Sequence, residues 1–409
     1  MNKKKIINDP LYGLIRIPFT LIFDLIEHPY FQRLRHIRQL GLTEYVYPGA
    51  VHNRFQHALG AMHLMQTALN NLRHKGIEVD DQEYEGAMIA VLLHDIGHGP
   101  FSHTLEETLL PNIQHEDLSV FLIEKLNDHF SGALSLALKI FKNEYERKFF
   151  HQLVSSQLDV DRLDYLNRDS FYTGVHEGTI GIDRILRMIT VVDDQLVVEE
   201  KGIYSIENFL NARRLMYWQV YLHKATIGID KVLVQIIKRA LDLTKAGVDL
   251  PTLPALKIFL KKRPSLDALK KDPELLKAFA ALDDHDIWGS IKLWLHTEDF
   301  TLSTLSNMLM ERKLFRVYLN NQMIPREESE RLINNISNTF NISAQEAGYF
   351  LMQGISSNAA YIAGNDKIYI LTKTNEIIDI AQAAELPNIK AISKIVKKYF
   401  LCYPKILSL

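Results

Sequence analysis

Residues 87–103, AMIAVLLHDIGHGPFSH, combine an apolar segment with a polar turn. Seven consecutive apolar residues, 87–93, predict a buried helix, which we expect over residues 83–95. Two glycines and a proline follow within residues 97–100 and end that helix. The His94-Asp95 pair therefore lies at the end of a buried helix, where a carboxylate is costly unless a group pairs with it. A divalent cation could pair with both side chains and offset this cost, although the His-Asp dipeptide alone is weak evidence for a metal site.

Histidines gather on both sides of this turn. Eight of the 16 histidines lie in residues 52–115, which are 64 of the 409 residues. Histidine is the commonest metal ligand and the usual acid or base near neutral pH, but exposed histidines can also cluster by chance. His57 begins a second expected helix and Asp161 lies on a third, so three helices would supply two imidazoles and two carboxylates. Asp159 and Asp164 are equally acidic, and spacing does not choose among these three residues.

The rest of the chain has a mostly helical pattern. Apolar residues at steps of three and four predict helices over residues 24–39, 54–72, 116–130, 149–168 and 206–245. Short β segments are expected at residues 12–18, in a hairpin of residues 189–192 and 195–199, and in a second hairpin of residues 367–372 and 376–380. Prolines and a basic run interrupt the pattern beyond Gly247. We therefore expect a core over residues 1–245 and a helical C-terminal lobe with a small hairpin over residues 246–409.

Composition excludes several classes of protein. The net charge is −2, which argues against a dedicated binder of nucleic acids or anionic membranes. The lone cysteine, Cys402, excludes a disulfide framework and a cysteine-based zinc site. The basic N-terminus is not followed by an apolar stretch, so we expect a cytoplasmic protein without a membrane span.

The sequence motifs around His57, His94-Asp95 and Asp161 resemble the four-residue signature of the HD superfamily of metal-dependent phosphohydrolases. FQRLR at residues 31–35, QLG at 39–41, VYPGA at 46–50, HNRF at 52–55 and LHDIGHGPFSH at 93–103 narrow the likeness to its deoxynucleoside triphosphate triphosphohydrolase branch. This resemblance implies an HD-type helical core. It also selects Asp161 as the fourth ligand of one divalent ion, beside His57, His94 and Asp95, with Mn, Mg, Fe, Ni and Zn not distinguished.

The same branch cleaves a deoxynucleoside triphosphate (dNTP) into the deoxynucleoside and inorganic triphosphate, with water attacking the α-phosphorus. His103 and Glu106 are three residues apart at the start of a helix and share a face. We expect Glu106 to orient His103 and keep it charged, with His103 as the acid/base, although Glu106 could instead cap the helix. His98 and His115 match histidines that surround the phosphates in the family.

Substrate contacts are also carried over from the resemblance. The matching residues are Gln39 and Leu40 for sugar and base, Arg54, Arg162 and Arg213 for phosphate, Tyr165, Asp169 and Tyr221 for sugar, and Tyr217 near the phosphates. At two of these positions the vertebrate enzyme of this branch has a different residue, which is Lys in place of Arg162 and His in place of Tyr217. The change at Arg162 keeps the charge but alters its geometry. A tyrosine packed under the sugar would leave no room for a 2′-hydroxyl.

Two other functions remain open from the sequence. An HD-type nucleotide phosphomonoesterase or phosphodiesterase would share the metal ligands but has no need of three arginines. A non-catalytic nucleotide sensor or scaffold would keep the pocket without turnover. The resemblance further implies a homo-oligomer and a possible activator nucleotide.

Overall fold

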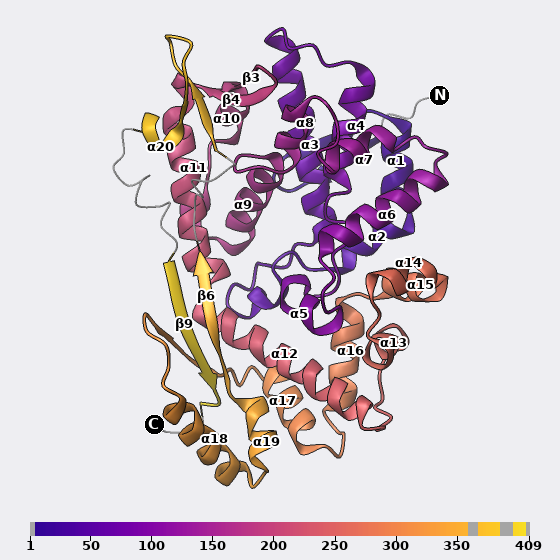
Figure 1. Cartoon of the computed structure of the whole chain (residues 1–409), viewed down its shortest axis with the longest axis vertical. Helices are drawn as coiled ribbons and strands as arrows, with labels where there is room; N and C mark the ends of the chain where they lie inside the picture. Colours follow the sequence, from indigo (N-terminus) through magenta and orange to yellow (C-terminus); the bar gives the residue numbers. More distant parts are fainter. Residues whose placement is uncertain (1–4, 359–366, 385–395, 406–409) are drawn as a thin grey trace.

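The computed structural model describes residues 5–358, 367–384 and 396–405 of the chain (Figure 1). Helices dominate these residues, so the mostly α class is confirmed. Those up to residue 245 are α1 (Thr20–Glu27), α2 (Pro29–Gln32), α3 (Arg54–His74), α4 (Asp81–Leu92), α5 (Ser102–Leu109), α6 (His115–His129), α7 (Ser135–Phe141), α8 (Lys148–Val154), α9 (Val160–Thr173), α10 (Ile182–Met188), α11 (Ile203–Met216) and α12 (Lys224–Lys245). Those beyond are α13 (Pro254–Lys262), α14 (Leu266–Lys271), α15 (Pro273–Ala281), α16 (Asp284–Trp294), α17 (Phe300–Met310), α18 (Arg326–Phe340), α19 (Ala344–Ala347) and α20 (Ile380–Ala383).

Helices α3, α4 and α9 form the frame of the core, since α3 packs against both of the others. Reciprocal hydrogen bonds between Asn53 and Gln56 fix the start of α3. Asp80 and Glu83 fix the start of α4 in the same way. Each cap satisfies backbone N–H groups in the first turn of its helix.

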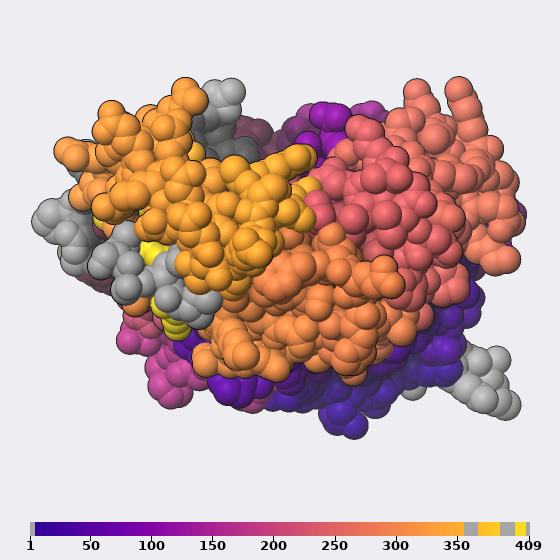
Figure 2. Space-filling view, turned by 90° about the horizontal axis from the view of Figure 1, so that it is seen from below, coloured from indigo at the N-terminus to yellow at the C-terminus, as the bar shows by residue number. Residues whose placement is uncertain are grey.

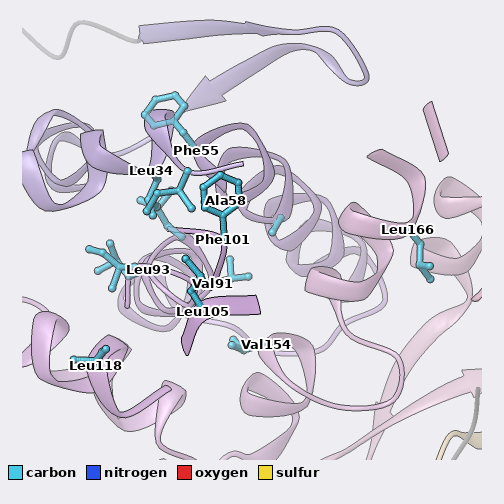
Figure 3. Close-up of a cluster of buried hydrophobic side chains, with 14 of the residues drawn as sticks. Leu34, Phe55, Ala58, Val91, Leu93, Phe101, Leu105, Leu118, Val154 and Leu166 are labelled. Atoms are coloured by element: carbon cyan, nitrogen blue, oxygen red, sulfur yellow. The ribbon is translucent and has the colours of Figure 1, made fainter. Parts of the chain in front are cut away.

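Apolar side chains from these helices and their neighbours gather into one cluster (Figure 3). Its members include Leu34, Phe55, Ala58, Val91 and Leu93, and each of them is almost fully buried. Burial of this kind contributes about 1.5–3 kcal/mol for a large aliphatic or aromatic side chain. The apolar run of residues 87–93 therefore anchors the polar turn that follows it.

Three helices that the sequence predicts as continuous are broken, and two of them lie before residue 169. The predicted helix over residues 24–39 stops at Glu27, because His28 precedes Pro29 and has an extended backbone. The predicted helix over residues 149–168 is interrupted at residues 155–159, between α8 and α9. Asp159 caps the new start there, and its carboxylate accepts from the backbone N–H of Arg162 at 2.7 Å.

The predicted helix over residues 206–245 is also interrupted. Its first half, α11, passes into a π-helical turn over residues 217–221. The chain then leaves the helical path, and His223 caps α12 by accepting from the backbone N–H of Ala225. π-Helical turns occur frequently at functional sites, and this one carries Tyr217 and Tyr221.

The strands form three small sheets. β1 (Lys5–Asp9) pairs with β2 (Gly13–Ile17) in an N-terminal hairpin, of which the sequence predicts only the second strand. Both predicted hairpins are present, β3 (Ile189–Val192) with β4 (Gln195–Glu199) and β7 (Tyr369–Leu371) with β8 (Ile377–Asp379). β4 and β7 pair in parallel, so the two hairpins form one sheet.

The third sheet lies in the C-terminal lobe. It corrects the prediction that this lobe is helical apart from one small hairpin. It has the order β5 (Arg316–Asn320), β9 (Val396–Tyr403) and β6 (Met352–Asn358), with antiparallel pairs throughout. Its strands are separated by long stretches of sequence, so no local turn signal links them.

Helix α12 joins the two parts of the chain. It packs against α5 of the first part and against α13, α17 and β5 of the second. Figure 2 shows that segments of the C-terminal part, coloured orange, cover much of the lower end of the molecule. The domain boundary near residue 246 stays a prediction. Within the described ranges, no helix is long and apolar enough to cross a membrane.

Candidate active site and metal centre

Four predicted ligands converge where α3, α9 and the end of α4 meet. The ligand atoms of His57, His94 and Asp161 all lie within 4.8 Å of one another. Asp161 Oδ1 is 3.0 Å from His57 Nε2 and 3.4 Å from His94 Nε2. Asp95 completes the group, with Oδ1 3.2 Å from His94 Nε2. The two Nε2 atoms face each other at 3.2 Å, a close approach of two lone pairs that a shared cation or proton would relieve.

The outward nitrogens of both imidazoles are already engaged. His57 Nδ1 lies 2.7 Å from Asp164 Oδ2, and His94 Nδ1 lies 2.6 Å from the carbonyl oxygen of Val91. Donation from each Nδ1 leaves each Nε2 lone pair directed into the group, which is the tautomer that metal ligation needs. The donor set therefore fits a divalent ion of the His and carboxylate type.

The three acids of α9 have three different roles. Asp161 faces the two histidines, Asp164 orients His57, and Asp159 caps the helix. Arg168 holds Asp164 through Nε at 2.9 Å and Nη2 at 3.0 Å, and it also donates to Asp9 of the N-terminal hairpin at 2.8 Å. Burial lowers the pKa of His57, but hydrogen bonds with Asp161 and Asp164 raise it more, to about 10.

A second cluster adjoins the first and contains His98, His103, Glu106 and His115. The rings of His98 and His115 stack at 3.9 Å between centroids, and His103 lies edge-on to both. His98 Nε2 is 3.2 Å from Asp95 Oδ1, which links the two clusters.

The expected pairing of Glu106 with His103 is wrong. Glu106 instead reaches the start of α6, where it accepts from the backbone N–H of His115 at 2.8 Å and lies 3.2 Å from its Nδ1. The pKa of His103 is lowered to about 4, first by burial and then by the charges of Arg54 and His115. Burial and the neighbouring cations therefore favour the neutral form of His103, whereas the expected pairing with Glu106 would favour the charged form.

A cleft of about 440 Å³ opens beside these clusters, within the size range of about 300–1,000 Å³ for small-molecule sites. Its walls include eight of the predicted residues: Gln39, Leu40, Arg54, His103, Tyr165, Asp169, Tyr217 and Tyr221. Burial raises the pKa of Tyr165, and the guanidinium groups of Arg213 and Arg162 lie close enough to oppose that rise. Among the described residues, the buried Nε atoms of Arg54, Arg162 and Arg213 have no hydrogen-bond partner.

One wall of the cleft is fixed by hydrogen bonds to Asp169. Its carboxylate accepts from the Tyr221 hydroxyl at 2.6 Å and lies 2.7 Å from His52 Nε2. The His52 ring in turn stacks on Tyr172, with centroids 4.5 Å apart. Asp169 is only 1% exposed, so its orientation is set before any ligand enters.

Sequence reasoning missed a residue that holds two segments of the cleft wall together. Asp284, at the start of α16, accepts from the backbone N–H of Arg38 at 2.8 Å and of Phe101 at 3.1 Å. Phe101 has left-handed backbone angles, φ 47° and ψ 38°, which are costly for a bulky side chain and persist only where neighbours enforce them. No sequence signal distinguishes Asp284 from the acids on either side of it.

Comparison with known proteins agrees with this arrangement. The HD domain matches residues 54–169, and the HD associated region matches residues 180–252. An uncharacterized protein of Bacillus subtilis, YwfO, is 31% identical over 420 residues, which are 99% of this chain and 93% of that protein. The chain belongs to the HD-domain family. A phosphohydrolase of Bacteroides thetaiotaomicron, known from its crystal structure, is 48% identical with a TM-score of 0.95, covering 98% of this chain and 100% of that one.

A second group of relatives has a named activity. The deoxynucleoside triphosphate triphosphohydrolase SAMHD1 homolog of Dictyostelium discoideum is 30% identical over 295 residues. The match covers 65% of this HD-domain chain and 57% of that protein, so the chain spans little more than half of that relative's length. The matched residues 54–169 contain all four candidate ligands, and HD domains bind divalent metals. The chain is therefore an HD-domain phosphohydrolase whose His and Asp group could hold such an ion.

Proposed function

We propose that this HD-domain phosphohydrolase hydrolyses deoxynucleoside triphosphates to the deoxynucleoside and inorganic triphosphate. The observation that carries the proposal is a single cleft in which Arg54 and His103 lie beside a wall of tyrosines, next to the candidate metal group. Arg162 and Arg213 adjoin it. Their Nη1 atoms already bond Asp159 and Gln157, but the Nε–H group of each has no partner among the described residues and suits a polyanion such as a triphosphate. A phosphomonoester would not need three such cations.

Each part of the substrate has a matching part of the cleft. A divalent ion held by His57, His94, Asp95 and Asp161 would polarise the α-phosphate. The arginines would bind the triphosphate, and the fixed Asp169 carboxylate would accept the 3′-hydroxyl. The Tyr221 ring would fill the space that a 2′-hydroxyl requires, which favours deoxyribose.

His103 is our candidate for the proton donor. Water attacks the α-phosphorus, the bond to the 5′-oxygen breaks, and that oxygen takes a proton from His103. The attacking water loses one proton to the solvent, and the solvent returns a proton to His103 after the reaction. Because burial and neighbouring cations lower the pKa of His103 to about 4, the ring needs an added negative charge to hold a proton near neutral pH. The bound triphosphate would supply that charge, so His103 would become an acid only with substrate in place.

The test is a matrix of divalent metals against the four dNTPs, each alone and paired with GTP, followed by product analysis. The expected products are inorganic triphosphate and deoxynucleoside. Monophosphate or diphosphate without triphosphate would contradict the proposal, and tight binding without any product would favour a sensor. Arg213→Gln should raise the KM for a dNTP by about tenfold or more, as expected for loss of a charged hydrogen bond. Arg187→Gln, on the exposed side of α10, is the matched control.

The pairs with GTP also test whether an activator nucleotide is needed, which is part of the proposal. A homo-oligomer and a cytoplasmic location complete it, and they rest on the family resemblance and on the composition of the sequence. Light scattering of the purified protein, with and without dNTP, measures the first of these.

A further inference from the structure

Helix α12 presents two polar side chains to the cleft that the proposed reaction does not use. Thr226 and Asp230 are four residues apart, so they share one face of the helix. Both line the cleft, together with Gly41 and Thr104. α12 packs there against α5 and against the 3₁₀ turn of residues 41–45.

The Thr226 hydroxyl lacks a hydrogen-bond partner in the described part of the chain, and the half-buried Asp230 has one in Thr104. Thr226 is only 3% exposed, and its Oγ1 has no hydrogen-bond partner among the described residues. Burial raises the pKa of Asp230 to about 7, against the opposing effects of Lys231 and of a hydrogen bond with Thr104. A carboxylate has room for about four hydrogen bonds, so Asp230 could accept several more.

The rest of the cleft is assigned to other parts of a nucleotide. Arg54 and His103 belong to the phosphate end, while Tyr165, Asp169 and Tyr221 form the sugar wall. Gln39 and Leu40, which precede Gly41, are the expected contacts of sugar and base, and the lining residues with no part assigned to them include Thr226 and Asp230. If the cleft holds a dNTP, this part is left for the nucleobase.

We propose that Asp230, together with Thr226, reads the nucleobase and selects guanine. This inference rests on the proposed function. Guanine presents two adjacent donors, N1–H and the 2-amino group, that match the two oxygens of a carboxylate. Adenine and cytosine each place an acceptor nitrogen beside their amino group, and thymine has a single N–H between two carbonyls. A carboxylate would repel those acceptors, so guanine alone can use both oxygens.

The experiment measures kcat/KM for dGTP, dATP and deoxyinosine triphosphate, which lacks the 2-amino group. Wild-type protein should prefer dGTP to both others by about 10- to 100-fold, the usual effect of a bidentate contact with a base. Asp230→Asn offers one donor and one acceptor, which suits adenine. The ratio of dGTP to dATP should fall by about the same factor in that variant. Asp242→Asn, further along α12 where Asp242 pairs with Tyr349, should leave the ratio unchanged.

The outcomes separate the two claims. Turnover of dNTPs with equal rates for dGTP and deoxyinosine triphosphate would overturn the proposal that Asp230 and Thr226 select guanine. It would leave the proposed function intact. Loss of all turnover in Asp230→Asn would not hide this result, because the comparison of substrates is made on the wild-type protein. Absence of dNTP turnover by the wild type, with every metal and with GTP, would overturn the proposed function and this inference with it.

Discussion

Gly60→Ala should weaken metal binding although Gly60 contacts no ligand atom of the metal group. A Cβ at this position of α3 would lie 2.0 Å from Asp164 Oδ1 and 2.2 Å from Arg168 Nη2. Side-chain contacts of a Cβ stay beyond 3.0 Å, so the carboxylate would have to retreat by 3.0 − 2.0 = 1.0 Å. Asp164 is fully buried and is clasped by Arg168 and His57, so this movement must stretch at least one of those contacts.

The size of the effect follows from these contacts. Moving Asp164 by 1 Å lengthens its 2.7 Å contact with His57 toward the limit of a hydrogen bond. Losing the partner of a metal-ligating histidine typically costs about 10- to 100-fold in metal affinity. Disrupting a buried ion pair lowers the free energy of unfolding by about 3–5 kcal/mol. Replacing a helical glycine by alanine raises it by about 1 kcal/mol. The variant should therefore be less stable by about 2–4 kcal/mol.

Calorimetric titration with Mn²⁺ and denaturant unfolding of the metal-free protein measure the two effects. Gly86→Ala is the matched control, because Gly86 is also helical and its added Cβ would meet only the flexible Leu136 side chain, at 3.0 Å. Asp164→Asn removes the charge without adding volume, so it should show the loss of affinity together with the full cost of a broken buried ion pair, about 3–5 kcal/mol. A Gly60→Ala variant that binds Mn²⁺ as tightly as wild type, and unfolds at a higher denaturant concentration, would refute the reasoning.

Three further predictions concern the same site. Asp161→Ala should abolish both metal binding and turnover, measured by metal analysis of the dialysed protein and by product release; full activity would remove Asp161 from the ligand set. Mn²⁺ affinity should rise about tenfold per pH unit from pH 6.5 towards 10, because the ion displaces a proton from His57, whose pKa is raised to about 10. The stability of the metal-free protein should fall across the same window, since a raised histidine pKa contributes stability below its unfolded value and loses it as the pH rises; a flat dependence would contradict this account. Asp284→Asn should lower kcat/KM about tenfold by leaving one backbone N–H of Arg38 or Phe101 without its acceptor, while Mn²⁺ affinity stays unchanged.

Local sequence signals predicted the elements well where those signals were strong. The hairpin of β3 and β4 has the predicted bounds, with its turn at Asp193-Asp194. Two of the helix breaks, before Val160 and before Lys224, were missed because a capping side chain begins the new helix without a glycine or proline to mark it. Asp159 and His223 each supply a capping acceptor, and in sequence neither differs from an ordinary surface residue of a longer helix.

Side-chain roles were harder to predict than elements. Spacing placed Asp161 and Asp164 on one helix, but the direction of each carboxylate depends on how α9 is turned against α3. Glu106 shows the same limit, because its helical position permits contact with His103 while the start of α6 offers His115 a stronger pairing. Asp284 lies far from the motifs in sequence, so only the packing of α16 brings it to the cleft.

The site divides into a part that the HD segment builds alone and a part that needs the rest of the chain. Residues 54–169 contain the four candidate ligands and the cluster around His103. The walls of the cleft also include Tyr217, Tyr221 and Asp230, which come from segments after α11, and Asp284 of α16 holds the backbone of Arg38 and Phe101 in the same walls. Changes in these later segments would therefore alter which nucleotide fits while leaving the metal group intact. On this view, relatives that share only the first part would share the chemistry at phosphorus, and base selection would have to be read from α12 in each of them.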